Sequence, residues 1–364
     1  MRRFIFLLLL IPGALPAQQA KQTTMTLDSL FQSYFKPNEP GGAVLLVKNN
    51  KVIYEKGFGI ADIKTKEPIT TKTLFNVGSI SKTFVAYGIL KLAKEGRLSL
   101  EDNVYKYFPD FKNERIAKKI KLYHLLTHTS GIPDSRPIKE QHDFYLTAKD
   151  EENFAPLKQT DTLQFEPGTK YKYSNPAFNG LALIIEKVTG KKWQQYIIQN
   201  IFRPAGMATS TITDGPHPES GVSHGYVLND KNDPIAIGFE ELDYGEEPTF
   251  AAAGNGGVWS SVEELWKYEQ AIQHYTFLNS EWINKSRTVY PFPAWKDTIP
   301  QRLGLSWFIN TDPRVMIGHT GSQGGFISDY CWWPEEKIFY VLLCNIPKPI
   351  LEIRGKVYEI LQKK

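Results

Sequence analysis

The segment Phe75-Asn76-Val77-Gly78-Ser79-Ile80-Ser81-Lys82-Thr83-Phe84 places a serine at the start of an apolar helix and a lysine one turn further along. The apolar positions after Ser79 repeat every three or four residues and stop at Gly96, where helices often end. This spacing predicts one buried helix over 79–95. Because positions i and i+3 share a helix face, we expect the Ser79 hydroxyl and the Lys82 amine to lie together.

A serine beside a lysine suggests nucleophilic chemistry, but the pair alone does not establish it. A hydroxyl is a weak nucleophile until a base takes its proton, and a lysine is such a base only when burial or nearby positive charge lowers its pKa. Lys82 lies on a mostly apolar helix, so we expect it to be buried. Ser79 is also a favoured residue for an ordinary helix cap, so catalysis requires partners elsewhere in the sequence.

Strand patterns occur near both ends of the chain. Two apolar runs at 43–47 and 52–54 flank the asparagines of 48–51, which suit a turn. A first helix is predicted at 26–35, and late strands and a last helix are predicted at 305–309, 315–319, 326–333, 338–344 and 350–361. Between them lie helix and loop patterns, including helices at 122–126 and 181–189.

This order predicts an α+β fold, with one antiparallel sheet built from both chain ends, flanked by helices and interrupted by a mainly helical insertion. The length of 364 residues exceeds what one hydrophobic core usually holds. We therefore expect a discontinuous sheet domain formed by 18–75 and 251–364. The inserted helical domain is expected at 76–250.

Residues 1–17 have the pattern of a secretory signal peptide. Arg2 and Arg3 precede the apolar run 4–11, and small residues follow as far as Ala17. The run is too short to span a bilayer comfortably, so we expect no integral membrane segment once it is removed. The sequence predicts an exported bacterial protein, periplasmic or secreted.

The charge balance argues against some classes of partner. The formal net charge is +4, and loss of Arg2 and Arg3 with a signal peptide would bring it closer to neutral. Such a balance gives no reason to expect binding to nucleic acid or to an anionic membrane. We expect a monomer that acts on a small molecule or a peptide.

The two cysteines lie on apolar runs that flank the turn residues 334–337. A hairpin there would place Cys331 opposite about Tyr340, several residues from Cys344. That separation is too great for a disulfide, so we expect two buried thiols.

Two further motifs follow the Ser79 helix. They are Tyr173-Ser174-Asn175 and His319-Thr320-Gly321-Ser322, and the three motifs occur in an order that resembles the penicillin-recognising serine hydrolases. That family includes class C β-lactamases, low-molecular-mass DD-peptidases and related esterases. The segments 125–131 and Ala253-Gly254-Asn255-Gly256-Gly257 also resemble family signatures. The resemblance covers nearly the whole chain after residue 17 and implies the same fold.

The resemblance implies roles for the first two motifs. Ser79 would be the nucleophile, and Lys82 its general base or part of a shared proton network. Tyr173 would deprotonate Ser79 or pass the proton to the leaving group, while Asn175 would hydrogen-bond the substrate and Lys82. A tyrosine is a base only if positive charge lowers its pKa from about 10, and Lys82 is the obvious candidate. The choice between Lys82 and Tyr173 stays open at this level.

The third motif would form the substrate-binding strand, with Thr320 and Gly321 beside the substrate. The resemblance implies an oxyanion hole made of the backbone amides of Ser79 and Ser322. His319 stands where most β-lactamases have lysine, and a mostly neutral histidine attracts a substrate carboxylate weakly. We expect structural or exposed roles for the other histidines, which are His124, His128, His142, His217, His224 and His274.

Other hydrolase classes fit the sequence poorly. The one Gly-x-Ser-x-Gly pattern, Gly221-Val222-Ser223-His224-Gly225, does not follow a predicted strand, as a conventional Ser-His-Asp hydrolase requires. His124 and His128 have a zinc-ligand spacing, but Leu125 occupies the place of the usual glutamate. We therefore expect no metal and no organic cofactor.

The sequence thus predicts an exported serine hydrolase that acts by acyl transfer on an ester, an amide or a D-alanyl peptide. Two alternatives stay open, namely a class C-like β-lactamase and a non-hydrolytic penicillin-binding sensor of the cell wall. Specificity is expected to depend on the loops at 141–155 and 211–250.

Overall fold

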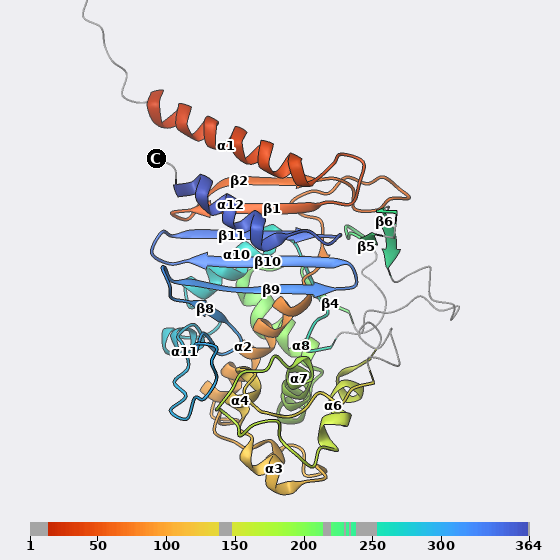
Figure 1. The fold of residues 1–364 in the computed structure, drawn as a ribbon, viewed down its shortest axis with the longest axis vertical. Coiled ribbons are helices and arrows are strands. Elements are labelled where there is room, and N and C mark those ends of the chain that lie inside the picture. The colour runs from red at the N-terminus through yellow and green to blue at the C-terminus, as the bar shows by residue number, and fades with distance from the viewer. Residues whose placement is uncertain are drawn as a thin grey trace, which may run out of the picture.

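The computed structural model of the chain describes residues 14–137, 148–213, 220–228, 231–232, 234–237 and 253–362. A six-stranded antiparallel sheet lies in the upper half of Figure 1, in the order β2-β1-β11-β10-β9-β8. Its strands are β1 (Gly42–Lys48), β2 (Lys51–Phe58), β8 (Phe308–Asn310), β9 (Met316–Gln323), β10 (Phe326–Trp333) and β11 (Ile338–Cys344). Because β1 pairs with β11, the two ends of the chain form one sheet, as predicted.

Two hairpins fix the register of this sheet. Asn49 and Asn50 join β1 to β2 with φ values of 53° and 59°, a left-handed conformation that asparagine tolerates. In the β10–β11 hairpin, Cys331 lies opposite Tyr340, as predicted. Cys331 and Cys344 are both buried and free, which confirms the expectation of two separate thiols.

One face of the sheet is covered by the first and last helices, α1 (Ala14–Tyr34) and α12 (Ile350–Gln362). Leu27 and Phe31 of α1 pack with Ile353 and Val357 of α12 in a separate apolar cluster over the sheet. Helix α1 begins at Ala14, earlier than the predicted 26–35, and so includes part of the predicted signal segment. The signal peptide itself stays a prediction.

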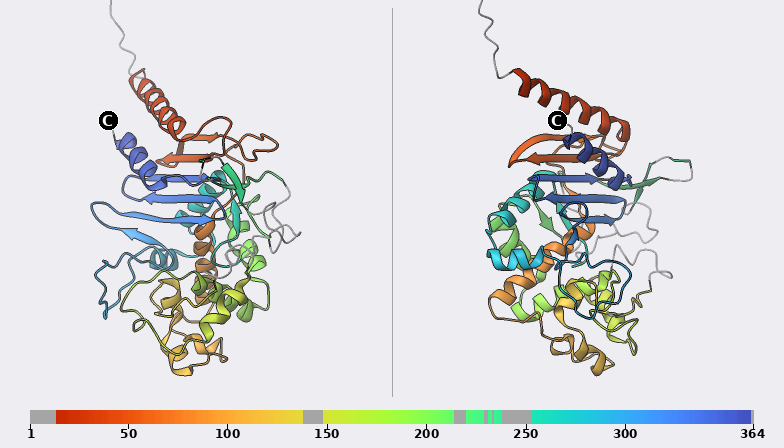
Figure 2. Two further views of the ribbon diagram at one scale, coloured as in Figure 1. Left: turned by 45° about the vertical axis from the view of Figure 1, so that its right-hand side comes forward. Right: turned by 60° about the vertical axis from the view of Figure 1, so that its left-hand side comes forward.

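The other face carries the larger core. Helix α10 (Val262–Gln273) packs on β11 and β1, and the views of Figure 2 place it on the side away from α12. Below the sheet lie the remaining helices and turns, which are α2 (Ser81–Lys94), η2 (Val104–Lys106), α3 (Glu114–Lys119), α4 (Leu122–Leu126), α6 (Asp150–Lys158), α7 (Asn175–Thr189), α8 (Trp193–Ile197), η3 (Ile198–Phe202), α9 (Arg203–Ala205) and α11 (Ser280–Ser286). The domain boundaries at 75 and 251 stay a prediction.

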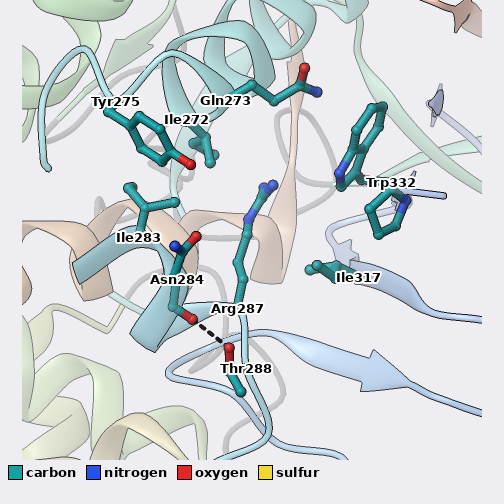
Figure 3. Close-up of a pocket in the computed structure, with 10 residues that line it drawn as sticks. Ile272, Gln273, Tyr275, Ile283, Asn284, Arg287, Thr288, Ile317 and Trp332 are labelled. Atoms are coloured by element: carbon teal, nitrogen blue, oxygen red, sulfur yellow. Dashed lines mark hydrogen bonds between the residues drawn. The ribbon is translucent and has the colours of Figure 1, made fainter. Parts of the chain in front are cut away.

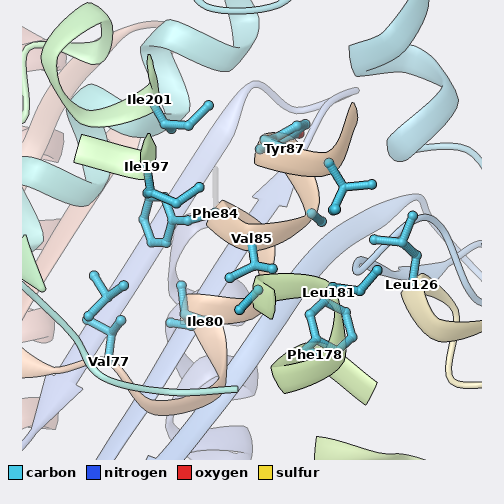
Figure 4. Close-up of a cluster of buried hydrophobic side chains, with 14 of the residues drawn as sticks. Val77, Ile80, Phe84, Val85, Tyr87, Leu126, Phe178, Leu181, Ile197 and Ile201 are labelled. Carbon is cyan, nitrogen blue, oxygen red and sulfur yellow. The ribbon is translucent and has the colours of Figure 1, made fainter. Parts of the chain in front are cut away.

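Helix α2 forms the centre of this core. Figure 4 shows Phe84 and Tyr87 of α2 together with Phe178 and Leu181 of α7 and Ile197 of α8, all of them fully buried. Aromatic and branched side chains therefore surround α2, and this packing fixes the position of its first turn.

Two helix starts differ from the prediction. Ser79 lies in a 3₁₀ turn, η1 (Gly78–Ile80), and the α-helix begins two residues later at Ser81. Helix α7 begins at Asn175 instead of 181, because the Ser174 side chain caps it by accepting a hydrogen bond from the Ala177 amide. Proline near the start of a helix, here Pro176, is a signal that could have given the correct boundary.

Five short strands were not predicted. β3 (Phe75–Asn76), β7 (Val258–Ser260) and β4 (Thr211–Ile212) form one small sheet, and β5 (Gly225–Leu228) pairs with β6 (Pro234–Ile237). Runs of two to four residues carry too little periodicity to be recognised. Of the predicted specificity loops, residues 141–147 and 238–250 lie outside the described residues.

Across the described ranges, the structure contains no helix with both the length and the apolar character needed to cross a membrane.

Candidate active site

The Ser79 turn is held between two strands. The amide of Val77 donates to the Val258 carbonyl at 2.9 Å, and the amide of Gly78 donates to Asn76 Oδ1 at 2.8 Å. Gly78 has a φ of 51°, and a Cβ built there would lie 2.7 Å from the Ser322 amide nitrogen of β9. Glycine is therefore required at this position for η1 to approach β9.

The approach is equally close from the side of β9. A Cβ on Gly321 would lie 2.1 Å from the Val77 carbonyl oxygen and 2.9 Å from the Ser79 amide nitrogen. The third motif and the nucleophile turn are thus in backbone contact. The Ser79 and Ser322 amides lie on these two adjoining segments, as the oxyanion hole implied by the family requires.

Lys82 lies directly behind Ser79 and is fully buried. Its amine lies 2.9 Å from Ser79 Oγ and donates to the Asn255 carbonyl at 2.6 Å. Burial, together with the positive charge of Arg136, holds the pKa of Lys82 well below its usual range. The expected meeting of hydroxyl and amine is present, and burial disfavours the charged form of the amine.

Asn175 differs from its expected role in one respect. Within the described part of the chain, the hydrogen bonds of the Lys82 amine go to Ser79 and Asn255, and none goes to the Asn175 side chain. Asn175 instead lines the hollow in front of Ser79. The contact from Asn255 was not predicted, although its Ala-Gly-Asn-Gly-Gly segment had been noted as a signature.

Tyr173 lies over the lysine amine, with its ring centroid 5.1 Å from Lys82 Nζ. Burial raises the pKa of Tyr173 above its usual value, and a hydrogen bond with Ser79 only partly opposes this. The condition under which Tyr173 could be a base, a pKa lowered by positive charge, is therefore not met. Desolvation of the buried phenol disfavours its charged form, and Tyr173 stays a neutral phenol.

His128 belongs to the surroundings of the site, which the sequence did not reveal. Its ring stacks on Tyr173 with centroids 4.2 Å apart, and its Nδ1 accepts a hydrogen bond from the Ser174 amide at 3.0 Å. Burial and the proximity of Lys82 hold the pKa of His128 well below its usual range. A structural or exposed role was expected for His128. In the structure it is buried and supports the second motif, through its contacts with Tyr173 and Ser174.

His319 is buried on β9, and its Nδ1 donates to the Thr320 carbonyl at 2.6 Å. Burial, with the positive charge of Lys82 adding to it, lowers the pKa of His319 to about 3. The imidazole is thus neutral at physiological pH. This agrees with the expectation that this position attracts a carboxylate only weakly.

The hollow in front of the nucleophile has a volume of about 260 Å³. Its lining is mostly polar and brings together residues far apart in the sequence, namely Ser79, Asn175, Asn255, Ser322, Gln323 and Gly324. Two of these, Asn255 and Gln323, had no predicted role. The three motifs therefore converge on one cleft, where amide groups can orient a polar substrate.

A second hollow of about 290 Å³ lies between α11, α10 and the β9–β10 edge of the sheet. Figure 3 shows Arg287, Asn284, Tyr275 and Trp332 around it. Nη1 and Nη2 of Arg287 donate to Oε1 and Oε2 of the Glu269 carboxylate, at 2.8 and 2.7 Å respectively. No residue of the three motifs lines this second hollow, whereas the hollow in front of Ser79 is lined by residues of all three.

Among the residues that the structure describes, no cluster of three or more histidine, cysteine, aspartate or glutamate side chains is arranged to hold a metal ion.

Known proteins resemble this chain over most of its length. A family model described as "Beta-lactamase" matches residues 27–362. Penicillin-binding protein 4* of Bacillus subtilis is 28% identical over 333 residues, which are 88% of this chain and 71% of that protein. The chain spans only 60% of the Protein flp sequences of Staphylococcus aureus, also at 28% identity.

Solved structures resemble the fold over nearly the whole chain. The octameric penicillin-binding protein homologue from Pyrococcus abyssi has a TM-score of 0.76 at 26% identity, covering 95% of this chain and 77% of that one. The D-amino acid amidase from Ochrobactrum anthropi SV3, solved with L-phenylalanine amide, has a TM-score of 0.75 at 21% identity and covers 95% and 99% of the two chains. At that lower identity the likeness concerns the fold alone.

Proposed function

The chain belongs to the β-lactamase family of serine hydrolases, and we propose that it is an exported enzyme that cleaves an ester, an amide or a D-alanyl peptide through a covalent Ser79 ester. The observation that carries the proposal is the buried Lys82 amine, 2.9 Å from Ser79 Oγ and with a lowered pKa. A neutral amine in that place is a base ready to take the serine proton.

The proposed reaction has two halves. The Lys82 amine takes the Ser79 proton as Oγ attacks the substrate carbonyl, and the amides of Ser79 and Ser322 stabilise the oxyanion. The bond to the leaving group then breaks, and the leaving group takes the proton from Lys82 through the Tyr173 hydroxyl. In the second half, water gives a proton through the Tyr173 hydroxyl to Lys82 as its oxygen attacks the carbonyl of the Ser79 ester. The bond between Ser79 Oγ and the acyl carbon then breaks, Oγ takes the proton back from Lys82, and the acid is released.

The directions of the two pKa shifts support this division of labour. The lowered pKa of Lys82 makes its neutral, basic form more accessible, whereas the raised pKa of Tyr173 keeps it a phenol that can donate and accept hydrogen bonds. We therefore assign the general base to Lys82 and the relay to Tyr173.

The neutral His319 supports a preference for substrates without a carboxylate, such as neutral esters and amides, over β-lactams. A β-lactam carries a carboxylate, and an imidazole whose pKa is lowered to about 3 offers it no positive charge. That one fold relative cleaves amides, according to its name, is consistent with an amide substrate here. We further propose that the enzyme is a monomer in the periplasm or outside the cell, acts on small or peptide substrates and requires no cofactor.

The test is intact-mass spectrometry of the protein incubated with a penicillin and, in parallel, with a p-nitrophenyl ester. We expect rapid ester turnover, little β-lactam hydrolysis, and loss of both the acyl adduct and turnover in Ser79→Ala. Substantial turnover by Ser79→Ala would disprove the mechanism. A lasting Ser79-dependent penicillin adduct without ester turnover would instead indicate a non-hydrolytic penicillin-binding sensor.

A further inference from the structure

The Asp150 carboxyl, at the start of α6, is a buried acid that the proposed mechanism does not use. It receives three hydrogen bonds, all from N–H groups of other segments. Oδ1 accepts from the Gly254 amide at 2.7 Å and from Asn179 Nδ2 at 2.8 Å, while Oδ2 accepts from Trp193 Nε1 at 2.7 Å. One carboxyl thus joins α6, α7, α8 and the turn before β7.

That turn leads directly to the lysine of the site. Asn255, the residue after Gly254, accepts from the Lys82 amine through its carbonyl at 2.6 Å. Its side-chain Oδ1 also accepts from Asn179 Nδ2 at 3.1 Å. Asp150 therefore binds the backbone amide of Gly254, just before Asn255. It also binds the Asn179 side-chain amide, which in turn donates to the Asn255 side chain.

The turn also has little room to move on its other side. A Cβ on Gly254 would lie 2.6 Å from Ala182 Cβ and 2.7 Å from the Phe178 carbonyl oxygen, both on α7. The turn is therefore fixed by packing against α7 and by the hydrogen bond to Asp150. Displacement of either support would move the Asn255 carbonyl away from Lys82.

Three N–H donors require a group that only accepts, which a carboxylate is and an amide is not. The price is that a full negative charge is buried without a cation among these partners. Burial raises the pKa of Asp150 to about 7, with the nearby Glu186 adding to the effect. The carboxyl thus gives donors from three other segments one common acceptor, which fixes these segments relative to one another.

We propose that Asp150 is a positioning residue for the hydrolysis, acting through Gly254 and Asn255 to hold the Lys82 amine in line with Ser79 Oγ. The inference rests on the proposed function. It concerns a residue outside the three motifs, which contacts neither the substrate hollow nor the reacting atoms.

The test compares Asp150→Leu with Trp193→Phe. The first variant removes the acceptor of both the Gly254 amide and Asn179 Nδ2, whereas the second shortens a buried ring and removes the donor to Oδ2 on the side away from the turn. Acylation by a p-nitrophenyl ester is followed by mass spectrometry, at a temperature well below the midpoint of thermal unfolding of each variant. The rate is divided by the fraction of the protein that can be labelled at Ser79.

We expect Asp150→Leu to acylate at least about tenfold more slowly per active site with KM nearly unchanged, because a small displacement of the base has a large effect on rate. Trp193→Phe should keep the rate of the wild type. If Asp150→Leu does not fold, Asn179→Ala breaks the link to Asn255 and should slow acylation in the same way.

The outcomes separate the two proposals. If the wild-type protein is neither labelled at Ser79 nor able to turn over the ester in a Ser79-dependent way, the proposed function fails. If the wild type acts through Ser79 and Asp150→Leu or its substitute is acylated at the same rate per site, or if Trp193→Phe slows as much, only the positioning role is disproved.

Discussion

Lys82 is the residue on which the chemistry depends. Its amine is surrounded by a hydroxyl, a carbonyl and two aromatic rings. The rings of Tyr173 and Phe178 lie 5.1 and 5.9 Å from Nζ, and no carboxylate of the described residues pairs with it. A charged lysine would be poorly solvated in this place. The same burial lowers the pKa of Lys82, of His128 and of His319.

A first prediction concerns the pH dependence of ester hydrolysis. The base acts only when Lys82 is deprotonated, so kcat/KM should rise with pH and reach a plateau well below the ordinary lysine pKa of 10.5, since burial lowers the pKa of Lys82. Stopped-flow rates from pH 5 to 10 with a non-ionisable ester measure this profile. A rise centred near pH 10 would contradict it.

Removal of the base should be costly. Lys82→Ala is expected to lower kcat/KM by about 100- to 10,000-fold, the usual contribution of a general base. Lys82→Arg should be as inactive, because a guanidinium stays charged. Steady-state ester hydrolysis measures both, with circular dichroism as a control for folding. An active Lys82→Arg variant would argue against lysine as the base.

His319→Lys tests the substrate preference. A lysine there would add a charged donor for a substrate carboxylate, and kcat/KM for a carboxylate-bearing ester should rise by about tenfold relative to its neutral methyl ester. The neutral ester is the matched control, because any general damage to the site lowers both rates. An unchanged ratio would mean that position 319 does not face the carboxylate.

At the scale of elements, the site depends on how closely η1 approaches β9. Gly321→Ala should press its methyl group against the Val77 carbonyl, where a Cβ would lie at 2.1 Å, and so open the proposed oxyanion hole. We expect a loss of about 1–3 kcal/mol in the free energy of unfolding, as for other overpacked sites. Acylation should slow more than this loss of stability explains.

The control for this variant is Gly355→Ala on α12. A Cβ on Gly355 would meet nothing within 4 Å, and alanine is the better helix former by about 0.5–1 kcal/mol. Thermal unfolding should therefore show a stabilised Gly355→Ala variant with unchanged acylation. If Gly321→Ala were as stable and as active as wild type, the close approach of η1 and β9 would be unimportant.

At the scale of the whole molecule, a buried ion pair connects the helical layer to the sheet. Glu269 of α10 binds the Arg287 guanidinium and accepts a hydrogen bond from the Tyr330 hydroxyl of β10. The Glu269 side chain is fully buried, and that of Arg287 is only 7% exposed. Both charges are satisfied by each other, so loss of one leaves the other unpaired.

Glu269→Gln should therefore destabilise the protein by about 3–5 kcal/mol, because the Arg287 charge stays buried without its partner. Urea unfolding followed by circular dichroism measures the change. Glu352→Gln, which breaks an exposed pair with Lys356 on α12, is the matched control and should leave the midpoint almost unchanged. Equal midpoints for the two variants would contradict the structural role of the buried pair.

The sequence by itself determined the features that depend on local spacing. The Ser79–Lys82 pair, the β10–β11 hairpin with Cys331 opposite Tyr340, and the sheet shared by both chain ends all follow from periodicity and turn residues. A spacing of three residues brings two side chains together through local backbone geometry alone. The order of the three motifs then sufficed to indicate the family.

Only the tertiary structure decided which groups surround that pair and what charge they carry. Asn255 and His128 lie at the site because β7 and the turn after α4 fold onto it, and Asp150 reaches the same turn from α6. The direction of the Tyr173 pKa shift was also out of reach of the sequence. Burial is a property of the assembled core, and desolvation decides the pKa of a buried group more strongly than its neighbours in the chain do.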